Sequence, residues 1–225
     1  VRDLAAGDSF VPVPVTGSAV AFQGRGSELA FTGAWKPRGF AQELTLTVVA
    51  DPPRDRALVV RVALPLQAVG WRWWDDMGAP RVIEADKHYD KLISWGGLRN
   101  VSRYPCCAVT GSPSARNGGL PPTSSLKRGG QQGDAVGLSL AVPVHEPQVF
   151  RLAYDAGRQA LEAEFDIGLS PDAKKSPCRT TFRLLVYAHE PEWGFRSAIS
   201  RYYQLFPAYE QRRAGAGGIW LIGLN

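Results

Sequence analysis

Most of the chain up to Glu190 shows the two-residue alternation of apolar and polar side chains that is typical of β-strands. In the segment 40–50, for example, Gln42, Glu43 and Thr45 interleave with leucines and valines. Similar runs, rich in Val, Leu, Thr and aromatic residues, occupy residues 10–15, 28–35, 57–67, 135–144, 148–156, 159–169 and 178–190. Turn residues separate these runs and no βαβ rhythm is present, so the pattern predicts an all-β fold built as a large antiparallel β-sandwich.

One long segment, residues 192–213, follows a helical period instead. Arginine and glutamine take the face opposite its apolar residues, which are Phe195, Ala198, Ile199, Tyr202, Leu205, Phe206 and Tyr209. Pro207 cannot donate a backbone hydrogen bond and disfavours a helical Phe206, so we expect the helix to kink or restart there. The sequence therefore predicts one C-terminal helix after the sandwich.

Composition divides the chain into three parts. Residues 1–191 form the predicted β-sandwich domain, within which 111–134 is a flexible loop rich in Gly, Pro and Ser. Residues 192–213 are a linker helix. The glycine-rich end, 214–225, leads into a new apolar run, as an exit toward a following domain would. We therefore expect the chain to be one part of a larger protein.

Charge and hydropathy argue against two classes of partner. The 225 residues carry a net charge of +5, but the basic residues are scattered singly, with close pairs at 127–128, 174–175 and 212–213. Nucleic-acid binding requires a concentrated basic patch, so it is not expected. No stretch approaches the roughly 18 continuous apolar residues that a membrane span needs. We predict neither a nucleic-acid partner nor a membrane span.

The three cysteines allow two interpretations. Cys106 and Cys107 are adjacent on a predicted strand, so their side chains face opposite sides and at most one of them can meet Cys178. We favour three buried thiols over one disulfide. Separately, Asn100, Val101 and Ser102 form an N-glycosylation triplet, which matters only if the protein is secreted.

Aromatic and acidic residues gather between positions 71 and 86. We predict a carbohydrate-binding site there, because Trp rings stack on sugar faces and carboxylates and guanidinium groups bind sugar hydroxyls. The candidate residues are Trp71, Trp73, Trp74, Asp75, Asp76 and Arg81. The structural alternative is that alternation places Trp71 and Trp73 in the core, with Asp75 capping a turn.

No catalytic, metal or cofactor site is predicted. Adjacent carboxylates diverge, whereas the two carboxyl groups of a glycosidase flank one bond at about 5 to 9 Å, so only Asp75 with Glu84 or Asp90 stays open as a pair. His88, His145 and His189 lack the spacing of metal ligands. Calcium binding through oxygen atoms is a weaker possibility, and its candidate ligands are Asp75, Asp76 and Asp86.

Several short sequence motifs resemble those of a known group of proteins. They are GWRWWDDM at 70–77, SRYP at 102–105, YDAGRQALEAEFDIGLS at 154–170, EWGFRSAISRYYQLFP at 192–207, and GIW at 218–220. In their residues and in their order along the chain, these motifs resemble the N-terminal β-supersandwich domain of large glycoside-hydrolase-like proteins. That domain is of the galactose-mutarotase-like type. The resemblance covers residues 40–220. It implies that a catalytic barrel follows the sandwich, so no catalytic residue can be carried over to this chain.

Three hypotheses about function follow. The first is a non-catalytic, carbohydrate-associated β-sandwich, the N-terminal part of an extracellular or cell-surface glycoside-hydrolase-like protein, shaping a site for poly- or oligosaccharide. The alternative is a structural or assembly protein that uses the sandwich as a packing module, with the 192–213 helix docking on a partner through Tyr202, Phe206 and Tyr209. The third is an enzyme complete within these 225 residues, which only the acidic and aromatic cluster supports.

Overall fold

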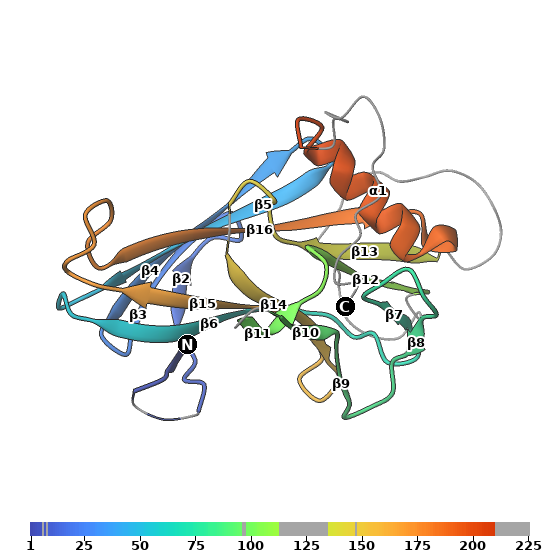
Figure 1. Ribbon diagram of the computed structural model, residues 1–225. Coiled ribbons are helices and arrows are strands. Elements are labelled where there is room, and N and C mark those ends of the chain that lie inside the picture. Colours follow the sequence, from blue (N-terminus) through green and yellow to red (C-terminus); the bar gives the residue numbers. More distant parts are fainter. Residues whose placement is uncertain (6, 8, 96–97, 113–134, 147, 210–225) are drawn as a thin grey trace, which may run out of the picture.

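The predicted all-β sandwich with one C-terminal helix is confirmed by the computed structural model (Figure 1), which describes residues 1–209 except 6, 8, 96–97, 113–134 and 147. All strand pairs in these residues are antiparallel. The larger sheet has nine strands in the order β2 (Val15–Gly17), β3 (Ala21–Gly26), β4 (Leu29–Arg38), β5 (Ala41–Ala50), β16 (Arg179–His189), β13 (Val136–Ala141), β12 (Cys106–Gly111), β7 (Arg72–Trp74) and β8 (Arg81–Val82).

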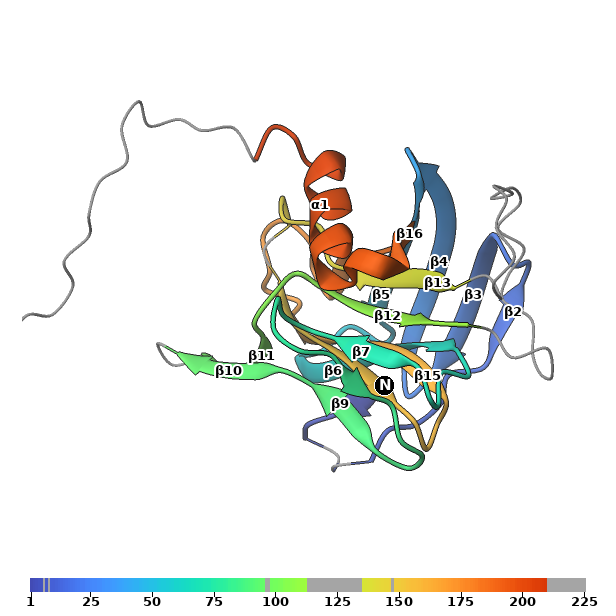
Figure 2. The same cartoon turned by 90° about the vertical axis from the view of Figure 1, so that its right-hand side faces the viewer.

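A second sheet of five strands packs against the first. Its order is β1 (Arg2–Asp3), β6 (Arg56–Pro65), β15 (Ala160–Leu169), β14 (Val149–Asp155) and β9 (His88–Asp90). A separate two-stranded hairpin, β10 (Leu92–Trp95) with β11 (Leu98–Ser102), extends away from the sandwich (Figure 2). The segment 69–102 therefore supplies five short strands, β7 to β11.

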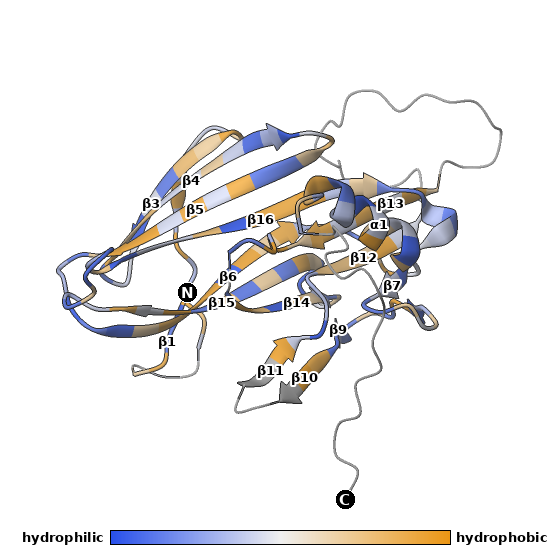
Figure 3. Cartoon of the chain, turned by 45° about the horizontal axis from the view of Figure 1, so that its top comes forward, coloured by the Kyte–Doolittle hydropathy of each residue, from blue (hydrophilic) through white to orange (hydrophobic). Residues whose placement is uncertain are grey.

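Strict alternation along the strands builds the main core between the two sheets. Figure 3 shows apolar and polar residues alternating along β5, as its sequence predicted. On β15, Leu161, Ala163 and Phe165 point into the core, and the intervening carboxylates point outward. Phe165 stacks on Phe182 of β16 with ring centroids 4.2 Å apart, which joins the two sheets. This core contains Trp73 and Cys107, both about 1% exposed.

The helix α1 (Phe195–Leu205), preceded by the 3₁₀ turn η1 (Pro191–Trp193), covers the outer face of β12, β13 and β16 (Figure 2). Its apolar face forms a second core with residues of those strands, among them Cys106, Leu185 and Tyr187. Two hydroxyl groups attach it: Tyr202 donates to the carbonyl of Val142 at 2.8 Å, and Tyr187 donates to that of Ala198 at 2.9 Å. The nine-stranded sheet is therefore buried on both faces where α1 lies.

The helix is shorter than the predicted 192–213. It begins at Phe195 and ends at Leu205, because Phe206, preceding Pro207, leaves the helical region with φ −132° and ψ 50°. Residues beyond 209 lie outside the described part of the chain, as does the predicted loop 111–134 apart from Gly111, which ends β12, and Ser112. In the segment 10–15, Val15 alone is in a strand, since prolines alternate there and cannot donate to a ladder.

The cysteines follow the favoured interpretation. All three are buried and free. Burial raises the pKa of the Cys106 thiol to about 12, so this thiol stays protonated at neutral pH and is a poor nucleophile. The cysteines therefore serve as small apolar residues of the two cores.

Gly194, which links η1 to α1, should not tolerate a side chain. Its φ of +48° disfavours other residues, and an added Cβ would lie 2.5 Å from Cζ2 of Trp74. We expect Gly194→Ala to reduce the free energy of unfolding by about 1 to 3 kcal/mol. Urea denaturation with an unchanged m-value would measure this.

Gly168→Ala provides the matched control. Gly168 lies on β15, and an added Cβ there would meet nothing within 4 Å. The same titration should show a change of a few tenths of a kcal/mol, about the size expected for a conformationally compatible Gly→Ala substitution. Equal losses in both variants would contradict the contact between Gly194 and Trp74.

Candidate functional site

The three tryptophans of the predicted carbohydrate site point into the protein. Trp71 and Trp73 are 8% and 1% exposed and belong to the main core, as the structural alternative stated. Trp74 lies on the opposite side of the sheet, where it packs against the second core and its Nε1 donates to Oγ1 of Thr110 at 2.9 Å. Trp71 and Trp73 therefore present no ring to solvent on which a sugar could stack, and Trp74 is partly buried.

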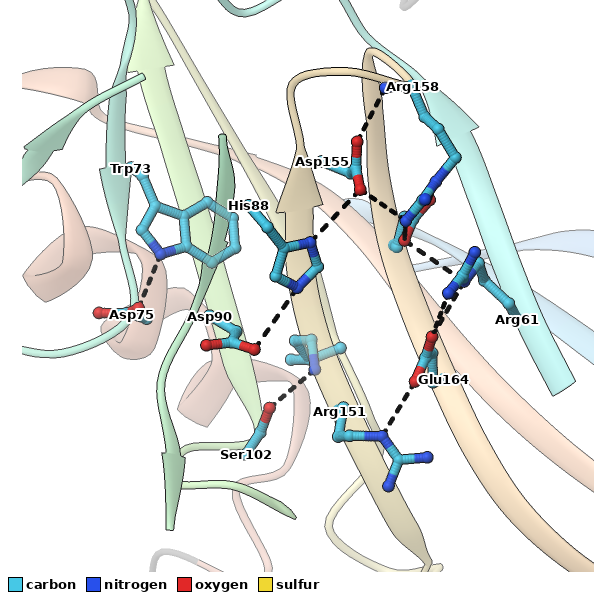
Figure 4. Close-up of polar contacts among 12 residues, drawn as sticks. Arg61, Trp73, Asp75, His88, Asp90, Ser102, Arg151, Asp155, Arg158 and Glu164 are labelled. Carbon is cyan, nitrogen blue, oxygen red and sulfur yellow. Dashed lines mark hydrogen bonds and ion pairs between the residues drawn. The ribbon is translucent and has the colours of Figure 1, made fainter. Parts of the chain in front are cut away.

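The charged members of this site are paired with each other or with neighbours. Asp75 accepts a hydrogen bond from Nε1 of Trp73 at 2.7 Å (Figure 4). It also accepts one from the guanidinium of Arg81. Asp76 is bound by Lys91 and by the backbone N–H of Gly78, and these contacts hold the pKa of its carboxyl below the ordinary value.

The cavity beside Asp75 is also too small for a sugar. It is lined in part by Ser102, Tyr104 and Cys106, and has a volume of about 10 Å³. This is room for a single water molecule. The residues 71–81 therefore form a structural cluster in this conformation, and a carbohydrate role for them stays a prediction.

A ladder of ion pairs covers the outer face of the five-stranded sheet. Arg61 of β6, Glu164 of β15 and Arg151 of β14 lie directly opposite one another across the three strands. Both arginines donate to the Glu164 carboxylate, at 2.7 to 3.0 Å (Figure 4). Burial opposes ionisation of Glu164, but the two guanidinium groups outweigh it and lower its pKa. Opposite charges that face each other on neighbouring strands stabilise the pairing of those strands, and each of these three side chains already has an ion-pair partner.

His88 extends this ladder at the edge strand β9. Its Nε2 and Nδ1 lie 3.4 Å from carboxylate oxygens of Asp90 and Asp155 (Figure 4). The hydrogen bond to Asp90 is the main reason that the pKa of His88 is raised above 6.5, with Asp155 contributing. The sequence did not show this cluster because β9 and β14 become neighbours only in the folded sheet.

A second histidine has the opposite environment. His189, the last residue of β16, is 5% exposed, and its Nδ1 lies 2.8 Å from Oγ of Ser139. Its Nε2 is buried without a hydrogen-bond partner among the described residues. The ring fits there because residue 137 is glycine, since a Cβ at that position would lie 2.6 Å from Nε2. Burial lowers the pKa of His189 to about 4.

A groove of about 460 Å³ runs along the solvent-facing side of α1. Its lining residues are mainly polar: Glu190, Trp193, Arg196, Ser197, Ser200, Arg201 and Gln204. The groove is shallow and largely open to solvent, so a ligand would lie along it and would not be enclosed. Trp193 is 63% exposed, far more than is usual for this residue type.

The charges at the start of this groove are held in place by hydrogen bonds. The Glu190 carboxylate accepts from the guanidinium of Arg201 and from the hydroxyl of Ser197, and these bonds lower the pKa of Glu190 to about 2. The hydroxyl of Ser197 in turn accepts from the backbone N–H of Glu190 at 3.0 Å. The groove was not predicted from the sequence, although Trp193, in the short segment between Pro191 and Gly194, was a usable signal.

The described residues contain no group of three or more His, Cys, Asp or Glu side chains that could hold a metal ion. Asp75 and Asp76 instead bind cationic side chains, so calcium binding there gains no support. In the same part of the chain, no helix is long and apolar enough to cross a membrane.

The buried His189 predicts a pH-dependent stability. Its folded pKa of about 4 lies below the ordinary 6.5, so as the pH falls through this window the unfolded chain binds a proton that the folded chain does not. We expect the free energy of unfolding to fall by up to about 1.4 kcal/mol per pH unit in this window. Denaturant titrations at several pH values would measure it. His189→Asn should remove this part of the slope, and an identical slope in both proteins would contradict the assignment.

His88 should give the opposite pH dependence of stability. Because its folded pKa is raised, it stabilises the fold at pH values below 6.5, and this contribution is lost as the pH rises through the folded pKa. Asp90→Asn should lower the pKa of His88 in an NMR titration of the imidazole. Asp166→Asn, on the same face but paired with Arg151, should leave it unchanged. A His88 pKa that does not respond to Asp90→Asn would refute the pairing.

Comparison with known proteins identifies no relative of the chain. No family model matches it, and no match is found among the curated proteins or the solved structures.

Proposed function

We propose that this chain is a non-catalytic, carbohydrate-associated β-sandwich domain whose glycan site is the groove along α1. The observation that carries the proposal is the exposed ring of Trp193 at the end of a groove lined by hydrogen-bonding side chains. An aromatic face beside hydroxyl, amide and guanidinium groups is the combination that binds sugar rings and their hydroxyls. Trp193 thus takes the stacking role that we predicted for the tryptophans at 71–74.

The groove supports binding better than hydrolysis. A glycosidase places two carboxyl groups about 5 to 9 Å apart around one bond. Glu190 is the single carboxyl group among the groove's lining residues, and its pKa of about 2 keeps it ionised, which does not suit a general acid. The domain would therefore position a glycan and leave any chemistry to other parts of a larger protein.

The proposal keeps the expected setting in an extracellular or cell-surface glycoside-hydrolase-like protein, and the likeness to galactose-mutarotase-like sandwiches stays a prediction. The alternative, helix docking on a partner, loses two of its three contact residues, because Tyr202 and Phe206 are buried beneath α1. Tyr209 is exposed, but it cannot form that apolar face by itself.

The test is a titration of the chain with a panel of neutral and acidic oligosaccharides, followed by tryptophan fluorescence and calorimetry. Trp193→Ala should weaken glycan binding by about 1 to 3 kcal/mol, by analogy with aromatic stacking on nucleic-acid bases. Tyr203→Ala is the matched control, because this exposed aromatic residue of α1 does not line the groove. The proposal fails if no glycan binds, or if both variants bind as the original chain does.

A further inference from the structure

We infer that the glycan bound in this groove is anionic, with its carboxylate or sulfate group on Arg196. This inference rests on the proposed function and adds the chemical class of the ligand. It follows from the difference between the two arginines that line the groove, Arg196 and Arg201.

The guanidinium of Arg201 already has partners within the protein. It forms an ion pair with Glu190, and its charged plane also lies over the ring of Phe40, 5.0 Å from the centroid. The pair leaves this part of the groove with no net charge. Displacing it would cost the hydrogen bonds that also connect Glu190 to Ser197. Arg201 is therefore a fixed part of the groove wall.

Arg196 has no hydrogen bond, ion pair or ring contact with any residue that the structure describes, and it is exposed on the first turn of α1. Its guanidinium keeps all five N–H donors for a ligand, in the planar fork that matches carboxylate and sulfate oxygens. With Glu190 and Arg201 neutralising each other, Arg196 gives the lined groove a net charge of +1. A neutral sugar would leave this charge without a partner.

The order of side chains along the helix fits an extended ligand. Arg196, Ser200 and Gln204 recur at four-residue intervals and so lie in one line on the helix surface, with Trp193 before them. The line from Arg196 to Gln204 spans about 12 Å at the α-helical rise of 1.5 Å per residue. A sugar ring on Trp193 would place its acidic group near Arg196, and the hydroxyl groups of the next unit near Ser200 and Gln204.

A protein partner fits this surface less well. Trp193 is the single large apolar side chain among the lining residues, whereas stable protein interfaces bury a well-packed apolar centre. The charged and hydrogen-bonding remainder favours a polar ligand. The net charge of +5 on the chain would also draw an anionic polymer toward the protein.

The experiment uses the full chain and calorimetric titration with three oligosaccharides of equal length: an oligogalacturonate, its methyl ester, and a sulfated oligosaccharide. We expect at least one anionic ligand to bind about 10-fold more tightly than the neutral ester, which corresponds to one ion-paired contact. The two anionic ligands distinguish a carboxylate from a sulfate ester. Raising the salt concentration should reduce the difference between the anionic and the neutral ligand.

Arg196→Gln should weaken binding of the anionic ligand about 10-fold more than binding of the neutral ester, so that the preference for the anionic ligand is lost. Arg179→Gln is the matched control, because this exposed arginine begins β16, whereas the groove follows the end of that strand. A strand of this length separates its ends by about 33 Å. Equal effects of the two variants would show attraction by overall charge and would overturn the site on Arg196.

The outcomes separate the two proposals. If the ester and the acid bind equally and Trp193→Ala weakens both, the groove binds glycans and the anionic class is wrong. If no glycan binds, both proposals fail. If sedimentation velocity shows self-association of the chain that Trp193→Ala abolishes, the exposed ring belongs to a protein interface, and the glycan site is also wrong.

Discussion

The burial of α1 on the nine-stranded sheet is the interaction on which the rest of the molecule depends. Strands β12, β13 and β16 are apolar on both faces, so without the helix they would expose Leu185 and Tyr187 to water. The hydroxyl of Tyr202 and the close contact between Trp74 and Gly194 fix where the helix lies. Because its inner face is held in this way, its outer face and the preceding turn with Trp193 present the groove in one orientation.

The charged side chains are paired to different extents on the two outer surfaces of the sandwich. On the five-stranded sheet, alternating acids and bases meet across neighbouring strands, and even Glu162, which is 1% exposed, is bound by both guanidinium nitrogens of Arg158 that face it. Those groups stabilise the sheet and have little left to offer a ligand. Along α1 the pairing is incomplete, since Glu190 satisfies Arg201 and leaves Arg196 available. A functional surface is more plausible where pairing stops than where it is complete.

The tryptophans show how far the pattern of residues can be trusted. Alternation correctly placed Trp71 and Trp73 on one side of a strand and Trp74 on the other, because side chains of a strand point to alternate faces. It could not show that one side is buried and the other partly covered, since this depends on the second sheet and on a helix about 120 residues later in the chain. The alternation thus described the local geometry, and the carbohydrate role proposed for these tryptophans stays a prediction.

The sequence by itself determined the fold class, most of the long strands and one helix near the C-terminus with an interruption at Pro207, because these follow from local periodicity and from the backbone chemistry of proline. Only the tertiary structure decided which polar residues meet. His88 reaches Asp155, and His189 reaches Ser139, through strand pairings between distant segments. The groove likewise exists because packing turns one face of α1 inward, which leaves Arg196 on the other face, next to Trp193 of the preceding turn.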